Sequence, residues 1–227
     1  GKVWVFCGQD VPNKKIDFEA LVNRVNFELT APDLLVHPQS SDDPDLSVEV
    51  EKNPDESLTN QVVTGVAIRW GLREIEALGI FVKELGSDGV LGPEIEIFKG
   101  NANSVSDFDF VIKGDNANDV VTGIALSFDG IFPGFSDKNM MELSFREFQP
   151  ETKQLSDTVT KKRGKSPITR VKEMELSFPN RKSVMIGLGV KTWDASFGNL
   201  VPEPGIPERD LLGLEVSFRN IKPVEEL

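Results

Sequence analysis

The sequence predicts an all-β fold of one domain with pseudo-threefold symmetry, and two observations lead to this prediction. First, an apolar segment with central small residues occurs three times, as VVTGVAIRW (Val62–Trp70), VVTGIALSF (Val120–Phe128) and VMIGLGVKT (Val184–Thr192). Second, each of these organising strands is preceded by one short alternating segment and followed, after a variable loop, by another. A unit of this size cannot bury its apolar face alone, so the three units should pack against one another.

We place the repeats at about 46–98, 108–171 and 174–219, within a single domain that spans residues 1–227. The returning strands predicted after the organising strands are Ala77–Leu85, Met140–Phe148 and Leu211–Arg219. The strands predicted before them, and assigned to the same repeats, are Leu46–Glu51, Phe108–Lys113 and Met174–Phe178. Apolar and polar residues alternate in these segments, which is typical of half-buried strands.

A fourth strand is expected in each repeat. Glu94–Phe98 fits this position in the first repeat and Ile168–Val171 in the second. The third repeat lacks such a segment, so we expect the N-terminal strand Lys2–Cys7 to fill the position and close the ring. The end of the segment Ile16–Leu29 also alternates like a strand. The proline-rich residues 31–45 and the polar residues 149–170 are predicted to be loops.

One face of each organising strand carries bulky side chains, such as Val62, Val66 and Ile68, and is predicted to be core. The opposite face carries unusually small residues: Gly65 and Ala67, Gly123 and Ala125, Gly187 and Gly189. Glycine within a strand often marks the close approach of another group. We therefore expect a partner subunit, the 149–170 segment or a flat apolar ligand to cover at least one of these small-residue strips.

Composition excludes several classes of function. The formal charge is −12, with 37 acidic against 25 basic residues, which argues against nucleic acid and anionic membranes as partners. No apolar run approaches the roughly 18 residues of a membrane span. A chain that starts at Gly1 suits a processed, secreted protein, although a trimmed chain would begin in the same way.

Catalytic and metal-binding motifs are not found in the sequence. His37 is the single histidine and Cys7 the single cysteine, which argues against nucleophilic triads, zinc sites and an intrachain disulfide. No phosphate-binding glycine motif occurs. Acidic pairs and the turn Asp115–Asp119 are interpreted as solvated surface, and so is the basic cluster at residues 161–165. We expect no enzyme activity, no metal and no cofactor.

The stretch Val120–Phe148, with its glycine-containing strand, acidic loop and returning strand, resembles the vitelline membrane outer-layer proteins. The three-sheet repeat also resembles jacalin-type lectins, and both resemblances imply a pseudo-threefold β-prism of three antiparallel sheets. The β-trefoil, which is also threefold, is the alternative fold. The chain departs from the vitelline pattern in having one cysteine, where that family is disulfide-bonded. Jacalin-type lectins bind sugar through an N-terminal glycine and a Gly-x-x-x-Asp loop, and here Gly189 to Asp194 is one residue too long.

These features predict a ligand site in the loops after the organising strands. Aromatic residues beside Asp and Asn can hold sugars, although aromatic residues that cap the core would occupy the same positions. The candidate residues are Gly1, Trp70, Asp129, Phe132, Phe135, Trp193, Asp194 and Asn199. The first hypothesis is a secreted, lectin-like protein that binds glycans. The alternative is an egg-coat or storage protein that forms homo- or hetero-oligomers and carries an apolar small molecule.

Overall fold

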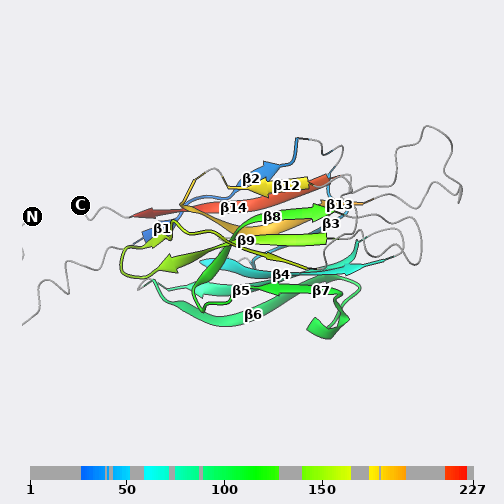
Figure 1. Cartoon of the computed structure of the whole chain (residues 1–227), viewed down its shortest axis with the longest axis horizontal. Coiled ribbons are helices and arrows are strands. Elements are labelled where there is room, and N and C mark those ends of the chain that lie inside the picture. The colour runs from blue at the N-terminus through cyan, green and yellow to red at the C-terminus, as the bar shows by residue number, and fades with distance from the viewer. Residues whose placement is uncertain are drawn as a thin grey trace, which may run out of the picture.

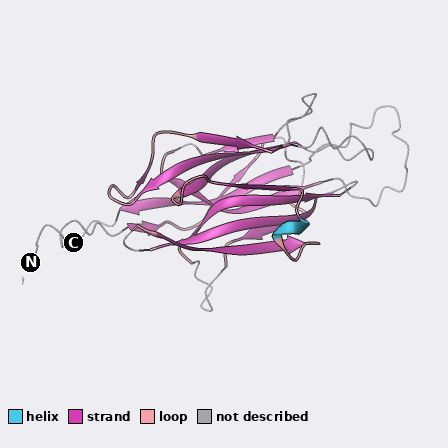
Figure 2. Cartoon of the chain, turned by 60° about the horizontal axis from the view of Figure 1, so that its bottom comes forward, coloured by secondary structure: helices cyan, strands magenta, loops and turns pink. Residues whose placement is uncertain are grey.

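The computed structural model describes residues 27–38, 40, 43–51, 59–71, 75–86, 89–127, 140–164, 174–178, 180–192 and 213–223. The protein is all-β, as predicted, and one short 3₁₀ helix, η1 (Val105–Asp107), accompanies the strands in this part of the chain. Three antiparallel sheets surround one core, and their strands run along the long axis of the molecule (Figures 1 and 2). The prism itself stays a prediction, and we use the word prism for this arrangement of three antiparallel sheets around a common core.

Each sheet is built on a hairpin of one organising strand and its returning strand. Sheet 1 has the strand order β6 (Leu91–Gly100), β5 (Ile75–Leu85), β4 (Gln61–Trp70), β7 (Phe110–Lys113). Sheet 2 contains β10 (Gln154–Leu155) and β11 (Thr160–Arg163) beside β9 (Met140–Gln149), then β8 (Asp119–Ser127) and β12 (Met174–Ser177). Sheet 3 contains β1 (Phe27–Leu29) and β2 (Asp33–Val36) beside β14 (Gly213–Pro223), then β13 (Ser183–Lys191) and β3 (Leu46–Glu49).

The strand that precedes each organising strand belongs to a different sheet from the one predicted. We assigned Leu46–Glu51, Phe108–Lys113 and Met174–Phe178 to the repeats that follow them. Instead, β7 pairs with β4 of the previous repeat, β12 pairs with β8, and β3 pairs with β13. Each sheet is therefore completed by a strand from the next repeat in the cycle. This exchange links all three sheets through the backbone.

A β-bulge occurs at the same position in all three organising strands. The pairing register shifts by one residue just before the first glycine, at Thr64, Thr122 and Ile186. The carbonyl oxygen of each bulged residue accepts a hydrogen bond from the exchanged strand: from Gly114 to Thr64 (3.2 Å), from Phe178 to Thr122 (3.2 Å) and from Val50 to Ile186 (2.9 Å). The bulged residues therefore help to hold the exchanged strands in place through these hydrogen bonds.

Because of the bulges, the strand faces predicted for the residues before them are wrong. Strict alternation placed Val62 on the same face as Val66, but an inserted residue reverses the face of everything before it. Val66, Ile68, Ile124 and Leu188 lie in the central core as predicted, together with Val63, Val121 and Met185. Val62, Val120 and Val184 instead form a second cluster with residues at the ends of the returning strands: Leu85, Phe148 and Ile221. This second cluster seals the end of the prism at which the organising strands begin, which we call the closed end.

The small-residue strips are covered by the chain itself. Ala67 is fully buried in a cluster with Phe81 and Phe108. A Cβ atom at Gly65 would lie 2.8 Å from the carbonyl oxygen of Ile112 on the exchanged strand β7, so only glycine fits there. In sheet 2, Glu142 and Glu175 lie opposite Ala125 on the two neighbouring strands. Lys161 contacts both carboxylates, at 3.1 Å and 3.5 Å, and these long side chains cover Ala125, which is buried.

In sheet 3, Ser217 and Glu49 flank Gly187 from either side, and the Ser217 hydroxyl donates to the Glu49 carboxylate (2.6 Å). The expectation that something covers the strips is therefore confirmed. The cover consists of side chains from neighbouring strands, which include β11 from the 149–170 segment.

Two predicted loops contain strands. β2 lies within residues 31–45, and β10 and β11 lie within residues 149–170. All three are short edge strands, where proline and charge are tolerated. The fourth strand predicted at Glu94–Phe98 is confirmed as β6, whereas β11 takes the corresponding place in sheet 2. Ile168–Val171 and Lys2–Cys7 lie outside the described residues, and both sides of the β13–β14 hairpin are paired by β1, β2 and β3.

Candidate functional site

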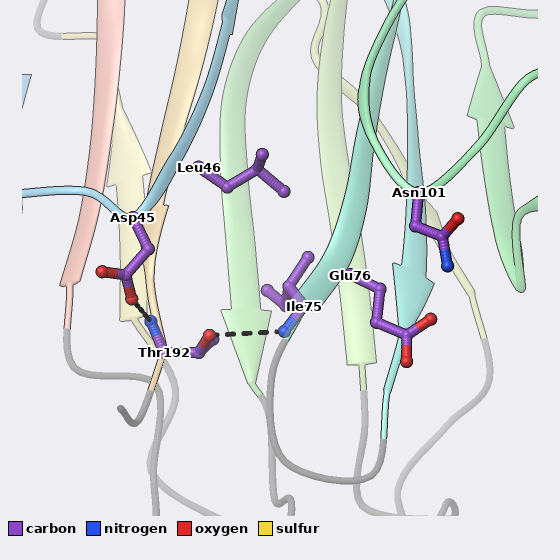
Figure 3. A pocket seen from close by; sticks show the side chains of 6 residues that line it. All are labelled: Asp45, Leu46, Ile75, Glu76, Asn101 and Thr192. Carbon is purple, nitrogen blue, oxygen red and sulfur yellow. Dashed lines mark hydrogen bonds between the residues drawn. The ribbon is translucent and has the colours of Figure 1, made fainter. Parts of the chain in front are cut away.

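A cleft of about 310 Å³ lies at the seam between sheets 1 and 3, at the end of the prism where β13 ends and β5 begins (Figure 3). This is the end opposite the closed end. The described residues that line it come from four separate segments of the chain: Asp45, Leu46, Ile75, Glu76, Asn101 and Thr192. We call this the seam cleft.

The seam cleft has two polar walls with apolar side chains between them (Figure 3). Asp45 and Thr192 form the wall from sheet 3, and Glu76 and Asn101 form the wall from sheet 1. Leu46 and Ile75 lie between the walls as an apolar floor. The site therefore presents carboxylate, amide and hydroxyl groups around a small hydrophobic surface.

The sheet 3 wall is fixed by hydrogen bonds at the end of β13. The backbone N–H of Thr192 donates to Oδ2 of Asp45 (3.3 Å), and Nζ of Lys191 lies 2.6 Å from Oδ1 of the same carboxylate. The Thr192 hydroxyl oxygen accepts a hydrogen bond from the backbone N–H of Ile75 (3.3 Å). This last bond connects sheet 3 to sheet 1 across the base of the cleft.

The sheet 1 wall is held by Arg69. Its Nε lies 3.1 Å from Oε2 of Glu76, and its Nη1 donates to the carbonyl oxygen of Asn101 (2.9 Å). The backbone N–H of Asn101 in turn donates to the carbonyl oxygen of Glu76 (2.9 Å). Both walls are thus organised before a ligand binds, which reduces the entropy lost on binding.

At the seam cleft, the third repeat has a small side chain where the first repeat has a large one. Counted along the organising strands, Trp70 in the first repeat and Phe128 in the second correspond to Thr192 in the third. The Trp70 ring packs edge-on against Phe110 of the exchanged strand, with 5.5 Å between ring centroids. Leu46 of β3 occupies the position of Phe110 in sheet 3. With Thr192 in place of an aromatic ring, Leu46 becomes part of the cleft floor.

Trp70 is the one predicted site residue among the described residues. It is half-buried and packs against the central core, and its backbone N–H donates to the Asp109 carboxylate (2.8 Å). Trp70 therefore caps the core of sheet 1, which was the other interpretation of these aromatic residues. The remaining candidates lie outside the described residues: Gly1, Asp129, Phe132, Phe135, Trp193, Asp194 and Asn199. Of these, Trp193 and Asp194 follow directly after Thr192 in the sequence.

The described residues of the cleft were not predicted from the sequence. Asp45, Glu76, Asn101 and Thr192 each lie near the end of a strand. The exchanged strand β3 brings Asp45 beside Thr192, and the pairing of β5 with β6 brings Glu76 beside Asn101. The comparison of Trp70, Phe128 and Thr192 was the available signal, because the loss of an aromatic side chain at one of three equivalent positions indicates a gap.

Within the described part of the chain, no helix is long and apolar enough to cross a membrane. In the same residues, no three His, Cys, Asp or Glu side chains are grouped so that they could hold a metal ion.

No protein-family model and no curated protein matches the sequence. Among solved structures, the chain is similar to the insecticidal delta-endotoxin Cry8Ea1 of Bacillus thuringiensis, with a TM-score of 0.37 and 13% sequence identity. The match covers 71% of this chain and 27% of the endotoxin chain.

Proposed function

We propose that the protein is a non-enzymatic, lectin-like binding protein that recognises carbohydrate at the seam cleft. The observation that carries this proposal is the arrangement of hydrogen-bonding walls around an apolar floor. A pyranose ring has the complementary arrangement, with hydroxyl groups at its edge and C–H groups on its faces. A volume of about 310 Å³ is at the small end of the range for small-molecule sites, and it suits one or two sugar rings.

Trp193 and Asp194 belong to this proposal because of their place in the chain. They directly follow Thr192, whose backbone and hydroxyl are part of the cleft. A tryptophan ring can stack on the apolar face of a pyranose, and a carboxylate accepts strong hydrogen bonds from paired hydroxyls.

A glycan array, followed by calorimetry with the sugars that bind, tests the proposal. Thr192→Phe restores a large side chain at the position of Trp70 and should fill the cleft, so binding should fall by at least tenfold. Trp193→Ala should abolish binding without unfolding the protein. Ile95→Phe is the matched control, because it adds the same ring at an exposed position of β6 and should leave the affinity unchanged. Wild-type protein that binds no glycan, or Thr192→Phe protein that binds as well as wild type, would contradict the proposal.

The second candidate, an oligomeric carrier of an apolar ligand, is favoured by a different observation. Leu34 and Val36 on the edge strand β2 are 50% and 45% exposed, and an exposed apolar edge strand can pair with another chain. The small-residue strips no longer support assembly, because side chains of the same molecule cover them. Native mass spectrometry of the wild type and of a Leu34→Lys variant tests this candidate. A monomeric wild type would count against it.

A further inference from the structure

The outer face of sheet 3 consists of two rows of residues that cross four neighbouring strands. From β2 through β14 and β13 to β3, the pairing registers give the first row: Leu34, Ser217, Gly187 and Glu49. In the same strand order, the second row is Val36, Glu215, Gly189 and Ser47. These residues face away from the core, because their chain neighbours Val216, Leu188 and Val48 belong to the core. We call these two rows the sheet 3 face.

The β2 edge of the sheet 3 face is apolar. Leu34 and Val36 are exposed aliphatic side chains two residues apart, and among the described strands β2 pairs with β14 alone. Exposed apolar side chains that lie together are typical of contact surfaces, because burial against a partner removes them from water. This edge therefore favours a partner that brings an apolar side chain.

The middle of the sheet 3 face is acidic. A Cβ atom at Gly187 would lie 2.6 Å from Cγ of Glu49, and one at Gly189 would lie 2.7 Å from Cγ of Glu215. The stems of the two glutamates therefore occupy the space above the glycines. Neither carboxylate, nor that of the nearby Asp43, forms an ion pair with a lysine or arginine of the described chain. The pKa of the Glu215 carboxyl lies above its usual value, because burial and the charges of Asp43 and Glu49 disfavour the charged form.

Glu142 on the outer face of sheet 2 is different, because Lys161 and Arg163 of the same molecule lie beside it. On sheet 3, the nearby Lys191 is paired with Asp45 instead. A half-buried carboxylate with two like charges near it is stabilised when a cation is placed beside it. The charges of the sheet 3 face therefore favour a cationic partner.

We propose that the sheet 3 face binds an extended, basic segment of a partner protein. An aliphatic or aromatic side chain of the segment packs on Leu34 and Val36, and its lysine or arginine side chains pair with Glu215 and Glu49. From β2 to β3 the segment crosses three strand spacings, roughly 14 Å, which is about four residues of extended chain. Residues i, i+2 and i+4 of such a chain lie on one side, so the expected pattern is apolar-x-basic-x-basic.

A second copy of this chain fits the sheet 3 face less well than a basic segment. A two-fold contact through this face would bring the same carboxylates of both copies together, and each copy carries a formal charge of −12. The proposal goes beyond carbohydrate binding and does not depend on it, because it concerns a different surface and a different class of partner.

A titration of ¹⁵N-labelled protein with synthetic peptides at low salt tests the proposal. The peptide GLSKSKG carries the expected pattern, and it should shift the backbone amide resonances of Leu34, Val36 and Glu215. GLSESEG, in which glutamate replaces both lysines, should bind at least tenfold more weakly. GSSKSKG lacks the apolar side chain and should also bind more weakly. Added salt should weaken the binding of GLSKSKG, because exposed charges are screened.

Variants of the protein locate the contact. The double variant Glu49→Gln/Glu215→Gln should bind GLSKSKG about tenfold more weakly, and Glu215→Gln alone is the second test if the double variant does not fold. Glu94→Gln/Glu96→Gln is the matched control: it makes the same change in net charge at exposed positions of β6, and the affinity should stay within about twofold.

Leu34→Ser tests the apolar part of the contact and should weaken binding by about threefold or more. Ile95→Ser is its matched control, because it removes an exposed aliphatic side chain from the edge strand of another sheet. This control should leave the affinity unchanged.

Three results would overturn the proposal. The first is equal binding of GLSKSKG and GLSESEG, or no shift at the sheet 3 face. The second is an affinity that is unchanged in both the glutamate variants and Leu34→Ser. The third is a set of shifts at Leu34 and Val36 that depends on protein concentration alone, since a second copy would then occupy the face. Sugar binding is measured separately, so failure of this proposal leaves the proposed function standing, and the reverse also holds.

Discussion

The two ends of the prism are built from equivalent positions of the three repeats, but different kinds of side chain occupy these positions. At the closed end, the equivalent residues are Val62, Val120 and Val184, and Leu85, Phe148 and Ile221 complete an apolar seal. Arg219 of β14 stabilises this end, because its buried guanidinium donates hydrogen bonds to the carbonyl oxygens of Leu29, Thr30 and Thr59. At the other end, Trp70 is matched by Thr192, and a polar cleft opens between sheets 1 and 3.

This difference shows where the repeats are free to diverge. The closed end keeps the same valine in all three copies, which favours a role in stability. The cleft end departs from the repeat at one position: the small, buried Thr192 stands where Trp70 stands in the first repeat, and Leu46 beside it is less buried than the corresponding Phe110. Substitutions at the closed end should therefore change the free energy of unfolding, whereas substitutions at the seam cleft should change binding.

The largest effect is expected for Phe148→Ala at the closed end. Phe148 is 1% exposed, and loss of a fully buried phenylalanine side chain typically costs about 3–5 kcal/mol because a cavity remains. Urea denaturation measures this loss. Ile95→Ala, at a site that is 40% exposed, is the control and should cost less than about 1 kcal/mol. A loss below 1 kcal/mol for Phe148→Ala would mean that the closed end is not a seal.

A smaller loss of stability is expected for Gly65→Ala, which tests the pairing of the exchanged strand β7 with β4. The added Cβ atom would lie 2.8 Å from a backbone oxygen of β7, so β7 must move, at a cost of about 2–3 kcal/mol. At Gly92 the nearest atom would be 3.5 Å away, an ordinary contact. Gly92→Ala should therefore be neutral or slightly stabilising. Equal stability of the two variants in urea would contradict the proposed role of the exchanged strand.

Glu142→Gln on the outer face of sheet 2 should cost about 1 kcal/mol at pH 7, the upper end of the range for exposed ion pairs. Burial raises the pKa of the Glu142 carboxyl, but hydrogen bonds from Lys161 and Arg163 lower it by more, so the pKa lies below its usual value. A lowered pKa means that the charged carboxylate stabilises the fold above about pH 4.5, and that this contribution is lost as the pH falls through the folded-state pKa.

The difference between wild type and Glu142→Gln should therefore be largest near neutral pH and should disappear in strong acid. Chemical denaturation at a series of pH values measures it. A difference that stays constant down to acid pH would show that the effect is not electrostatic.

A loss of stability smaller than that of Phe148→Ala is expected for Thr192→Phe at the seam cleft. Thr192 is 3% exposed, so the larger ring must displace neighbouring atoms to reach the open space of the cleft, and the Ile75 N–H loses its acceptor; the cost should be about 1–2 kcal/mol. Thermal unfolding should show a melting temperature lowered by a few degrees. A loss as large as that of Phe148→Ala would mean that Thr192 belongs to a sealed core and that the two ends do not differ.

The strands of the repeat were predictable because they are long and strongly patterned. The six strands of the central hairpins were all predicted to within a few residues, from Val62–Trp70 to Leu211–Arg219. The short strands β7, β12 and β3 were also predicted as strands, but they were assigned to the wrong sheets, since their patterns fit either adjacent sheet. The exchange is a choice of tertiary pairing, and strand periodicity contains no information about it. The charged strand β11 was missed because its four residues, TKKR, lack apolar alternation.

The seam cleft lies near the segments in which the sequence predicts a ligand site, but its described residues were not among the predicted ones. The sequence pointed to the loops after the organising strands, and the seam cleft lies at that end, beside the start of the third variable loop. Its described residues come from segments as far apart as Asp45 and Thr192, so only the folded chain brings them together. Trp70 was chosen for its aromatic ring, but that ring belongs to the core.

Mapping the bound sugar on the protein surface tests the central claim most directly. The measurement is a titration of ¹⁵N-labelled protein with a sugar identified on the array, followed through backbone amide resonances. The account predicts that the shifted resonances cluster at Asp45, Ile75, Asn101 and Thr192, and that residues of the closed end, such as Val120 and Phe148, remain unchanged. Shifts confined to the closed end or to the outer sheet faces, with none at the seam cleft, would contradict it.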